Sequence, residues 1–135
     1  MNDPRIELTK SWLTKAEHDL DSAKKLSEEP NPLFDTAIYH CQQVAEKALK
    51  GYLAFLDQPL EKTHDIRVLV QMGIQTDARF SRLMEDAERL TPYAEEFRYP
   101  GDENEPSKEE FDLAMQSSEK IFSFVMDLLS NELRQ

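Results

Sequence analysis

Cysteine, glycine and long apolar runs are scarce in this sequence of 135 residues, and each absence excludes a class of protein. One cysteine can form no internal disulfide, which excludes a disulfide-based framework. Three glycines supply little of the residue that tight β-turns and phosphate-cradling loops require, which argues against an all-β fold and a glycine-rich nucleotide loop. No apolar run reaches the roughly 20 residues of a membrane-spanning helix. The polar start, Met1-Asn2-Asp3-Pro4, lacks the apolar segment of a signal peptide, so we expect a cytoplasmic location. The length predicts a single domain over residues 1–135.

Basic residues are also few, with 16 against 27 acidic ones and a net charge of −11. A chain of this charge repels nucleic acid through its overall field, so RNA is not expected as a non-specific ligand. The acidic charge is concentrated between Tyr93 and Asp112, where eight acidic residues and two basic ones give a net charge of −6. Such a segment suits a protein partner.

Apolar residues recur along the chain at alternating intervals of three and four, which is the period of an amphipathic helix. This pattern predicts five helices and no strand, over residues of about 3–28, 32–56, 64–72, 77–99 and 107–133. The fourth helix is expected to kink or restart at Pro92. We therefore predict an all-α fold, an antiparallel four-helix up-and-down bundle with one extra short helix.

Several residues are placed to start, stop or pack these helices. Asn31 and Thr63 are suited to cap the second and third helices. Gly73 is expected to end the third helix. Gly51 lies inside the second helix, where glycine costs about 1 kcal/mol relative to alanine, and the close approach of another helix would explain it.

The second helix combines an apolar stripe, running from Phe34 to Phe55, with two polar faces. The face opposite the apolar stripe carries Gln42, Glu46 and Lys50. Between these faces lie Tyr39, His40, Gln43 and Lys47.

The final helix has two adjacent apolar stripes, and one seam of a bundle can bury only one of them. The second stripe consists of Met115, Phe122, Met126 and Leu129. Leaving these side chains in water would forgo roughly 1.5–3 kcal/mol for each one that could be buried. We therefore predict a homodimer with these four residues at its interface.

Metal and nucleophile chemistry have little support in the sequence. Glu61 and His64 have the Glu-x-x-His spacing of di-iron bundles, but those sites need two such pairs and further glutamates, so no metal site is predicted. Cys41 lies in the apolar stripe, which favours a buried structural thiol over a nucleophile. His18, between two acidic residues, is interpreted as a surface histidine. Walker, nucleophile-elbow and dinucleotide motifs do not occur, so we predict no catalytic residue and no cofactor.

Six polar residues are candidates for a site that binds a phosphate or a nucleotide: Tyr39, His40, Lys47, His64, Arg98 and Tyr99. We predict that Lys47, His64 and Arg98 converge at one mouth. Two cations and a titratable imidazole there would suit a phosphate, and Tyr99 would offer a stacking surface. A structural interpretation stays open. In it, Arg98 caps its own helix and pairs with Glu95 or Asp102, and His64 stabilises a helix start with Asp65.

Three segments, in order along the chain, resemble the HEPN domain family. Residues 37–53 (AIYHCQQVAEKALKGYL) resemble its central helix, and residues 62–66 (KTHDI) resemble the Thr-His-Asp segment that follows. Residues 90–93 (LTPY) and 97–100 (FRYP) resemble its Arg-Tyr-Pro ending. The resemblance covers nearly the whole chain and implies a small α-helical bundle, usually a dimer. It also implies a stand-alone prokaryotic protein, often encoded beside a minimal nucleotidyltransferase partner in toxin–antitoxin-like pairs.

Many HEPN proteins are metal-independent ribonucleases, in which an arginine and a histidine a few residues later meet across the dimer interface and act on the phosphate and the 2′-hydroxyl. This sequence lacks that pair, because Arg5 is the only arginine before the last histidine, His64, and no histidine follows Arg98. The resemblance therefore implies a non-catalytic binding module, with a nucleotide suggested at Lys47, His64, Arg98 and Tyr99. Two alternatives stay open: a ribonuclease toxin with a degenerate active site, and a purely structural homodimer.

Overall fold

A computed structural model describes residues 3–60, 62–101 and 104–133 of the chain. These residues form five α-helices and no strand: α1 (Pro4–Leu26), α2 (Phe34–Phe55), α3 (Ile66–Thr76), α4 (Met84–Leu90) and α5 (Lys108–Leu133). Two 3-10 helices, η1 (Ala78–Leu83) and η2 (Thr91–Ala94), flank α4. The predicted all-α fold is confirmed.

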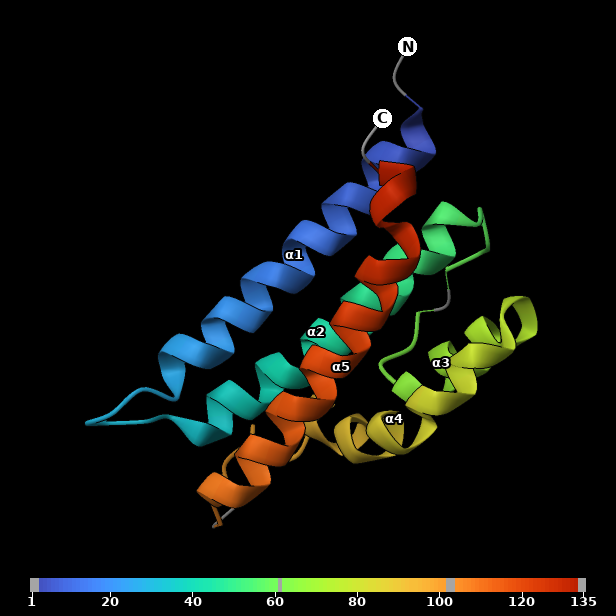
Figure 1. Ribbon diagram of the computed structural model, residues 1–135. Helices are drawn as coiled ribbons and strands as arrows, with labels where there is room; N and C mark the ends of the chain where they lie inside the picture. The colour runs from blue at the N-terminus through green and yellow to red at the C-terminus, as the bar shows by residue number, and fades with distance from the viewer. Residues whose placement is uncertain (1–2, 61, 102–103, 134–135) are drawn as a thin grey trace.

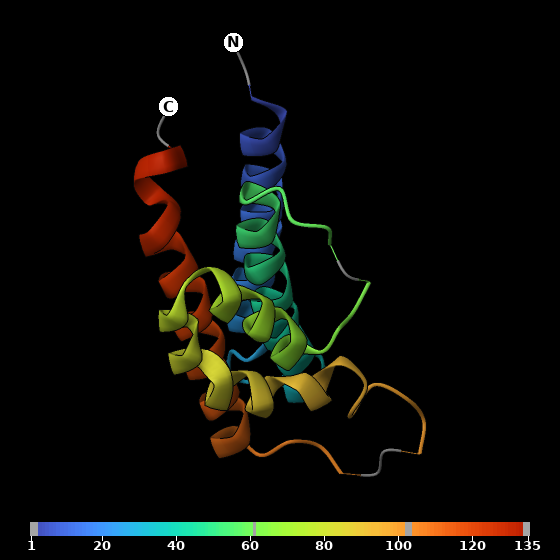
Figure 2. The ribbon, with the colours of Figure 1, turned by 90° about the vertical axis from the view of Figure 1, so that its right-hand side faces the viewer.

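The helices are arranged in layers around α2 and α5. Figures 1 and 2 show α1 on one side of this central pair and α3 with α4 on the other. α1 runs in the opposite direction to α2 and α5 (Figure 1). α2 packs against α1, α3, η2 and α5, so most of its residues from Ala37 to Ala54 are buried.

The segment between α3 and α5 differs from the single kinked helix predicted there. It is divided into η1, α4 and η2, so the bundle has three long helices and a set of short ones in place of the fourth. Asp77 is extended, with φ −154° and ψ 109°, and its side chain accepts a hydrogen bond from the Arg79 amide, which starts a new helical turn. Pro92, which has no N–H, lies at the start of η2.

The residues that cap α2 and α3 differ from those predicted. α2 begins at Phe34 behind Leu33, which makes no side-chain cap, so Asn31 lies outside the helix. α3 is capped by Asp65, whose side chain accepts from the Arg67 amide at 3.0 Å. Thr63 instead accepts a hydrogen bond from the Asp65 amide at 3.0 Å, and so supports the capping residue.

The two helical glycines both lie at close contacts. A Cβ on Gly51 would be 3.2 Å from the Cβ of Trp12, so the predicted close approach of another helix is confirmed, and that helix is α1. Gly73 does not end α3, which continues to Thr76. A Cβ on Gly73 would lie 2.7 Å from Cδ1 of Phe80, so this glycine makes room for an aromatic ring of the core.

Candidate functional site

The side of α2 that faces α1 holds an imidazole and an ammonium on one buried carboxylate. His40 Nδ1 donates a 2.7 Å hydrogen bond to Asp19 Oδ1, and Lys47 Nζ donates a 2.7 Å hydrogen bond to Asp19 Oδ2. His40 and Lys47 are about two helical turns apart, so they point to the same side of α2. Asp19 comes from α1 and is 7% exposed. This carboxylate therefore fixes the positions of both groups.

The charge of Asp19 is set by its surroundings. Burial acts to raise the pKa of this carboxyl, but hydrogen bonds from His40 and Lys47 and the charge of Lys47 lower it by more, so the pKa lies below its ordinary value of 3.8. Asp19 is therefore ionised at neutral pH and offsets the charge of Lys47. Since Nδ1 of His40 is used as a donor, Nε2 is an acceptor in the neutral ring and a second donor in the protonated one.

Arg98 extends this group toward the start of α2. Its guanidinium lies 4.0 Å from the ring centroid of Tyr39 and 5.5 Å from that of Tyr99. Nη1 donates a 2.7 Å hydrogen bond to the carbonyl of Ala94, so Arg98 also caps η2. The Tyr39 ring meets the His40 ring edge-on, with 5.6 Å between centroids. The connected group, here named the Asp19 cluster, consists of Asp19, Tyr39, His40, Lys47, Arg98 and Tyr99.

His64 lies on a different side of α2. Its Nδ1 donates a 2.8 Å hydrogen bond to Oε1 of Glu46. Glu46 and Lys47 are neighbours in sequence, and successive residues of a helix point about 100° apart, so Glu46 faces the segment leading into α3 while Lys47 faces α1. Contacts thus link Lys47 to Arg98 through the Asp19 cluster, whereas a second carboxylate holds His64.

Glu46 is the centre of a second buried polar network. Lys50 Nζ donates to it at 3.1 Å and Gln42 Nε2 at 3.2 Å, and Gln42 Nε2 also donates to the His64 carbonyl at 2.9 Å. Burial acts to raise the pKa of Glu46, but the hydrogen bonds from His64, Lys50 and Gln42 outweigh it and leave the pKa below 4.5.

This network corrects the expected polar face of α2. Gln42, Glu46 and Lys50 lie opposite the apolar stripe in the sequence, yet they are 0%, 5% and 8% exposed. They are buried because α3 and the segment before it pack against this face. Their polar atoms bond to one another and to His64, which compensates for the loss of water.

Asp19 is not among the site residues that the sequence predicts. The signal is its position, three residues after Ala16 and four before Ala23, two apolar residues of α1 that are both 0% exposed. A carboxylate on the buried face of a helix needs a partner, and His40 and Lys47 supply two.

The four residues predicted at a dimer interface are placed differently from one another. Phe122 and Met126 are half-buried and line a groove between α1 and α5. Met115 is half-buried, and its Sδ lies 3.8 Å from Sγ of Cys41. Leu129 is 2% exposed and belongs to the core. The part of this stripe that a partner could reach therefore centres on Phe122 and Met126.

The structure gives no support for nucleophile or metal chemistry at the other residues considered in the sequence, so far as it describes them. Cys41 is buried, and burial raises the pKa of its thiol to about 12, so the reactive thiolate is not formed at neutral pH. His18 is exposed. Among the described residues, no group of three or more His, Cys, Asp and Glu side chains could hold a metal ion, and Glu61 lies outside them. No helix in this part of the chain is both long and apolar enough to cross a membrane.

The protein is thus all-α, and Lys47, Arg98 and the imidazole of His40 lie along its central helix, α2. Over residues 9–129 the sequence matches the model of the HEPN domain, and the chain belongs to the HEPN domain family.

Two solved structures are similar to this chain. TT1696 from Thermus thermophilus shares 27% identity at a TM-score of 0.73, over 88% of this chain and 96% of that one. ST0689, an archaeal HEPN homologue, shares 23% identity at a TM-score of 0.69, over 90% of this chain and 97% of that one, and this likeness shows the fold alone. A comparison with curated proteins finds no match.

Proposed function

We propose that this protein is a non-catalytic HEPN-type binding module, and that the Asp19 cluster binds a phosphate-bearing ligand such as a nucleotide. The observation that carries the proposal is the connected row of Lys47, Asp19, His40, Tyr39 and Arg98. With neutral His40, the row has a net charge of +1 in a protein of net charge −11. A local positive site is what an anion needs to approach such a chain.

Each member of the cluster has a role that suits this ligand. The guanidinium of Arg98 has five N–H donors and uses one of them on Ala94, so it can also bind a phosphate through two parallel hydrogen bonds. Tyr99 is 59% exposed beside it and offers an aromatic face to a base.

Calorimetric titration with ATP, GTP and inorganic pyrophosphate tests this proposal. We expect Arg98→Ala to weaken binding by about tenfold or more, since it removes a bidentate charged partner. Lys24→Ala, a change of an exposed lysine elsewhere on α1, is the matched control and should leave the affinity unchanged. Absence of binding to the wild-type protein, or binding that Arg98→Ala leaves intact, would reject the site.

We further propose that the module forms a homodimer and pairs with a minimal nucleotidyltransferase in a toxin–antitoxin-like system. Family membership, the half-buried apolar side chains of α5 and the acidic segment from Tyr93 to Asp112 support a protein partner. The test is co-expression with the product of any adjacent nucleotidyltransferase reading frame, followed by size-exclusion chromatography. Separate elution of the two proteins would count against the pairing.

One observation favours a second candidate, a ribonuclease with an unconventional active site. The Asp19–His40 pair orients an imidazole with a buried carboxylate, as a general base requires, and Arg98 is connected to it through Tyr39. We nevertheless expect purified protein to leave RNA intact in the presence of EDTA, because the family's arginine–histidine spacing is absent and the net charge of −11 repels RNA. Cleavage that co-purifies with the protein and disappears in His40→Ala would establish the ribonuclease instead.

A further inference from the structure

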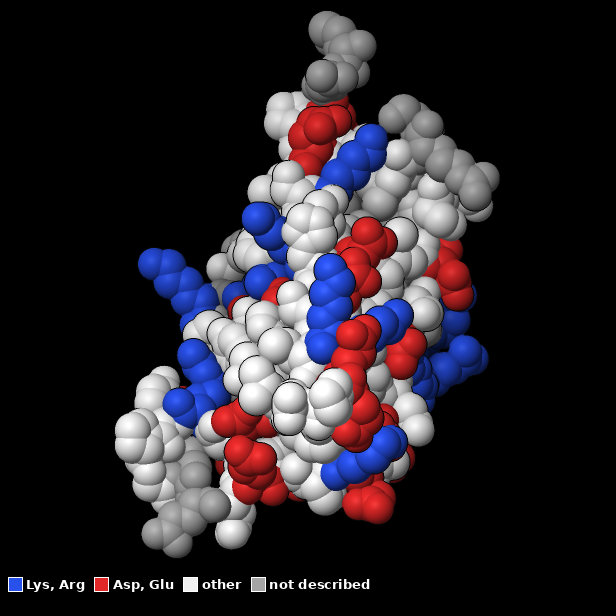
Figure 3. Space-filling model, turned by 90° about the vertical axis from the view of Figure 1, so that its left-hand side faces the viewer, with Lys and Arg blue, Asp and Glu red and all other residues white. Residues whose placement is uncertain are grey.

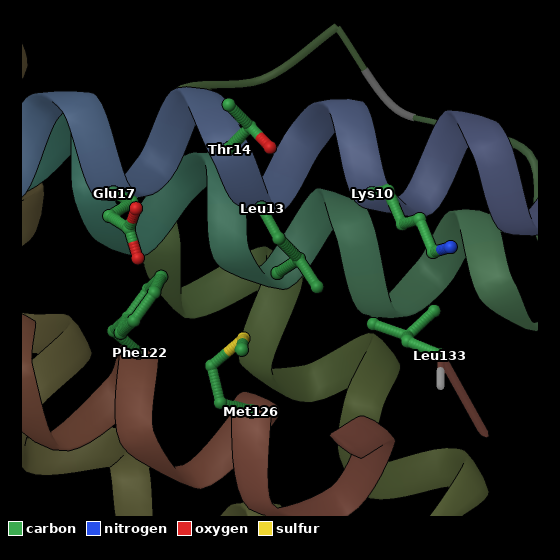
Figure 4. A pocket seen from close by; sticks show the side chains of 7 residues that line it. All are labelled: Lys10, Leu13, Thr14, Glu17, Phe122, Met126 and Leu133. Carbon is green, nitrogen blue, oxygen red and sulfur yellow. The ribbon is translucent and has the colours of Figure 1, made fainter. Parts of the chain in front are cut away.

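A groove of about 240 Å³ lies between α1 and α5, away from the Asp19 cluster. It is lined by Lys10, Leu13, Thr14, Glu17, Phe122, Met126 and Leu133. Figure 4 shows the first four side chains on α1 and the last three on α5, with Lys10 near Leu133 at one end and Glu17 near Phe122 at the other. The middle of the groove is apolar and each end carries one charge.

The apolar middle of the groove exposes side chains that a second copy could cover. Phe122, Met126 and Leu133 are half-buried in the single chain, so part of each remains in contact with water beside Leu13. Covering such side chains is favourable by about 25 cal/mol for each Å² of apolar surface removed from water. Phe122 and Met126 also belong to the second apolar stripe of α5.

The charges at the two ends are arranged symmetrically along α1. Lys10 and Glu17 lie at equal distances in sequence from the point between Leu13 and Thr14. If two copies of α1 pack antiparallel about a two-fold axis through that point, Lys10 of each copy faces Glu17 of the other. A two-fold axis brings the same patch of both subunits together, so this groove is complementary to itself in charge and in apolar character.

The rest of this surface agrees with such an arrangement. Figure 3 shows basic and acidic side chains intermixed on the face of the molecule that carries α1, with no extended area of one sign that would repel a second copy. Another hollow on α1, lined by Leu8, Ser11, Trp12 and Lys15, has one basic residue and no acidic one, and lacks this self-complementarity.

We propose that the groove between α1 and α5 is the homodimer interface, with a two-fold axis that crosses α1 between Leu13 and Thr14 and pairs Lys10 with Glu17 of the second copy. This rests on the homodimer of the proposed function and adds which surface forms it. The occupant is a second copy of this chain, and the helix of an unrelated protein is a competing outcome of the test.

Exchange of the two charges tests the interface. Lys10→Glu alone and Glu17→Lys alone each place like charges opposite each other at both ends of the homodimer. We expect each variant to raise the dimer Kd about tenfold, which corresponds to roughly 1.4 kcal/mol. When the two variants are mixed, Glu at 10 faces Lys at 17, and Lys at 10 faces Glu at 17, so both pairs become attractive and the mixture should dimerise about as well as the wild type.

The measurement is analytical ultracentrifugation of each variant, of the mixture and of the wild type, whose monomer mass is 15.7 kDa. Asp21→Lys and Lys24→Glu, two exposed changes elsewhere on α1, form the control pair and should leave the dimer Kd unchanged alone and mixed. A wild-type monomer at high micromolar concentration would reject both the dimer and this interface. A wild-type dimer whose Kd the exchanges leave unchanged would reject this interface but not the dimer. The same conclusion would follow if the exchanges weakened binding to a different protein and left the dimer Kd unchanged.

Discussion

Neutralising Asp19 tests whether the buried carboxylate holds the site together. In Asp19→Asn the side chain keeps its size, but it loses the charge that His40 and Lys47 share at 2.7 Å each. The amide keeps one acceptor oxygen, so one of the two hydrogen bonds can persist. The change therefore removes one charged hydrogen bond and leaves Lys47 without its anionic partner.

The expected loss is about 1.5–3 kcal/mol of the free energy of unfolding at pH 7, the usual range for a hydrogen bond to a charged group. The loss should depend on pH. The folded-state pKa of Asp19 lies below 3.8, so ionised Asp19 stabilises the fold above about pH 4, and this contribution disappears as the pH falls through the lowered pKa. Wild type and variant should thus converge in stability in strong acid.

Urea unfolding followed by circular dichroism, at neutral pH and at several acidic values, measures this difference. Asp21→Asn is the matched control, because Asp21 is exposed on the same helix, and it should change stability by less than about 0.5 kcal/mol. A loss that is equal at all pH values would show that packing, and not charge, is responsible. Equal stability of Asp19→Asn and the wild type at pH 7 would refute the role of the carboxylate altogether.

Two further predictions concern the core. Gly73→Ala should lower the free energy of unfolding by about 1–3 kcal/mol, because the new Cβ would lie 2.7 Å from Cδ1 of Phe80. Gly51→Ala should change it by less than about 1 kcal/mol, because its contacts are at 3.2 Å and alanine favours the helix. Urea unfolding measures both variants, and a larger loss for Gly51→Ala than for Gly73→Ala would contradict this prediction. Cys41 should react with a thiol reagent at pH 8 only after denaturation, because burial raises its pKa to about 12, and rapid labelling of the folded protein would contradict this.

The long helices were predictable because their apolar residues recur with the helical period over more than 20 residues each. The division of the segment around α4 into η1, α4 and η2 was not predictable. Its apolar residues follow the same helical period, but local hydrogen bonds interrupt the helix. Asp77 offers its side chain to the Arg79 amide, and Pro92 has no N–H to continue a helix. The periodicity of a short segment reports which residues are buried, and it does not report where the backbone bends.

The candidate site was predictable in its residue types and less so in its grouping. Tyr39, His40 and Lys47 share a side of one helix, and this follows from their spacing alone. Their connection to Asp19 and Arg98 depends on how α1 and η2 pack on α2. That packing involves residues far apart in sequence, so the spacing within any one helix leaves it undetermined.

The segments that resemble HEPN domains contain two polar groups with different roles, and one pair of variants should separate them. Glu46 bonds to His64 and Lys50 inside the fold and fixes the segment leading into α3, so Glu46→Gln should lower the free energy of unfolding by about 1.5–3 kcal/mol. Because this network lies on a different side of α2, the variant should keep its affinity for a phosphate ligand at temperatures where it is folded.

Arg98→Ala should show the opposite behaviour. Its guanidinium is exposed, its hydrogen bond to the Ala94 carbonyl lies at the surface, and its contact with Tyr39 is worth only about 0.5–1 kcal/mol. Stability should therefore fall by about 1 kcal/mol at most, while binding weakens by about tenfold or more. Urea unfolding and calorimetric titration of both variants measure the two effects. If Glu46→Gln weakened binding as much as Arg98→Ala did, both sides of α2 would contribute to one site, and the division between a structural and a binding group would be wrong.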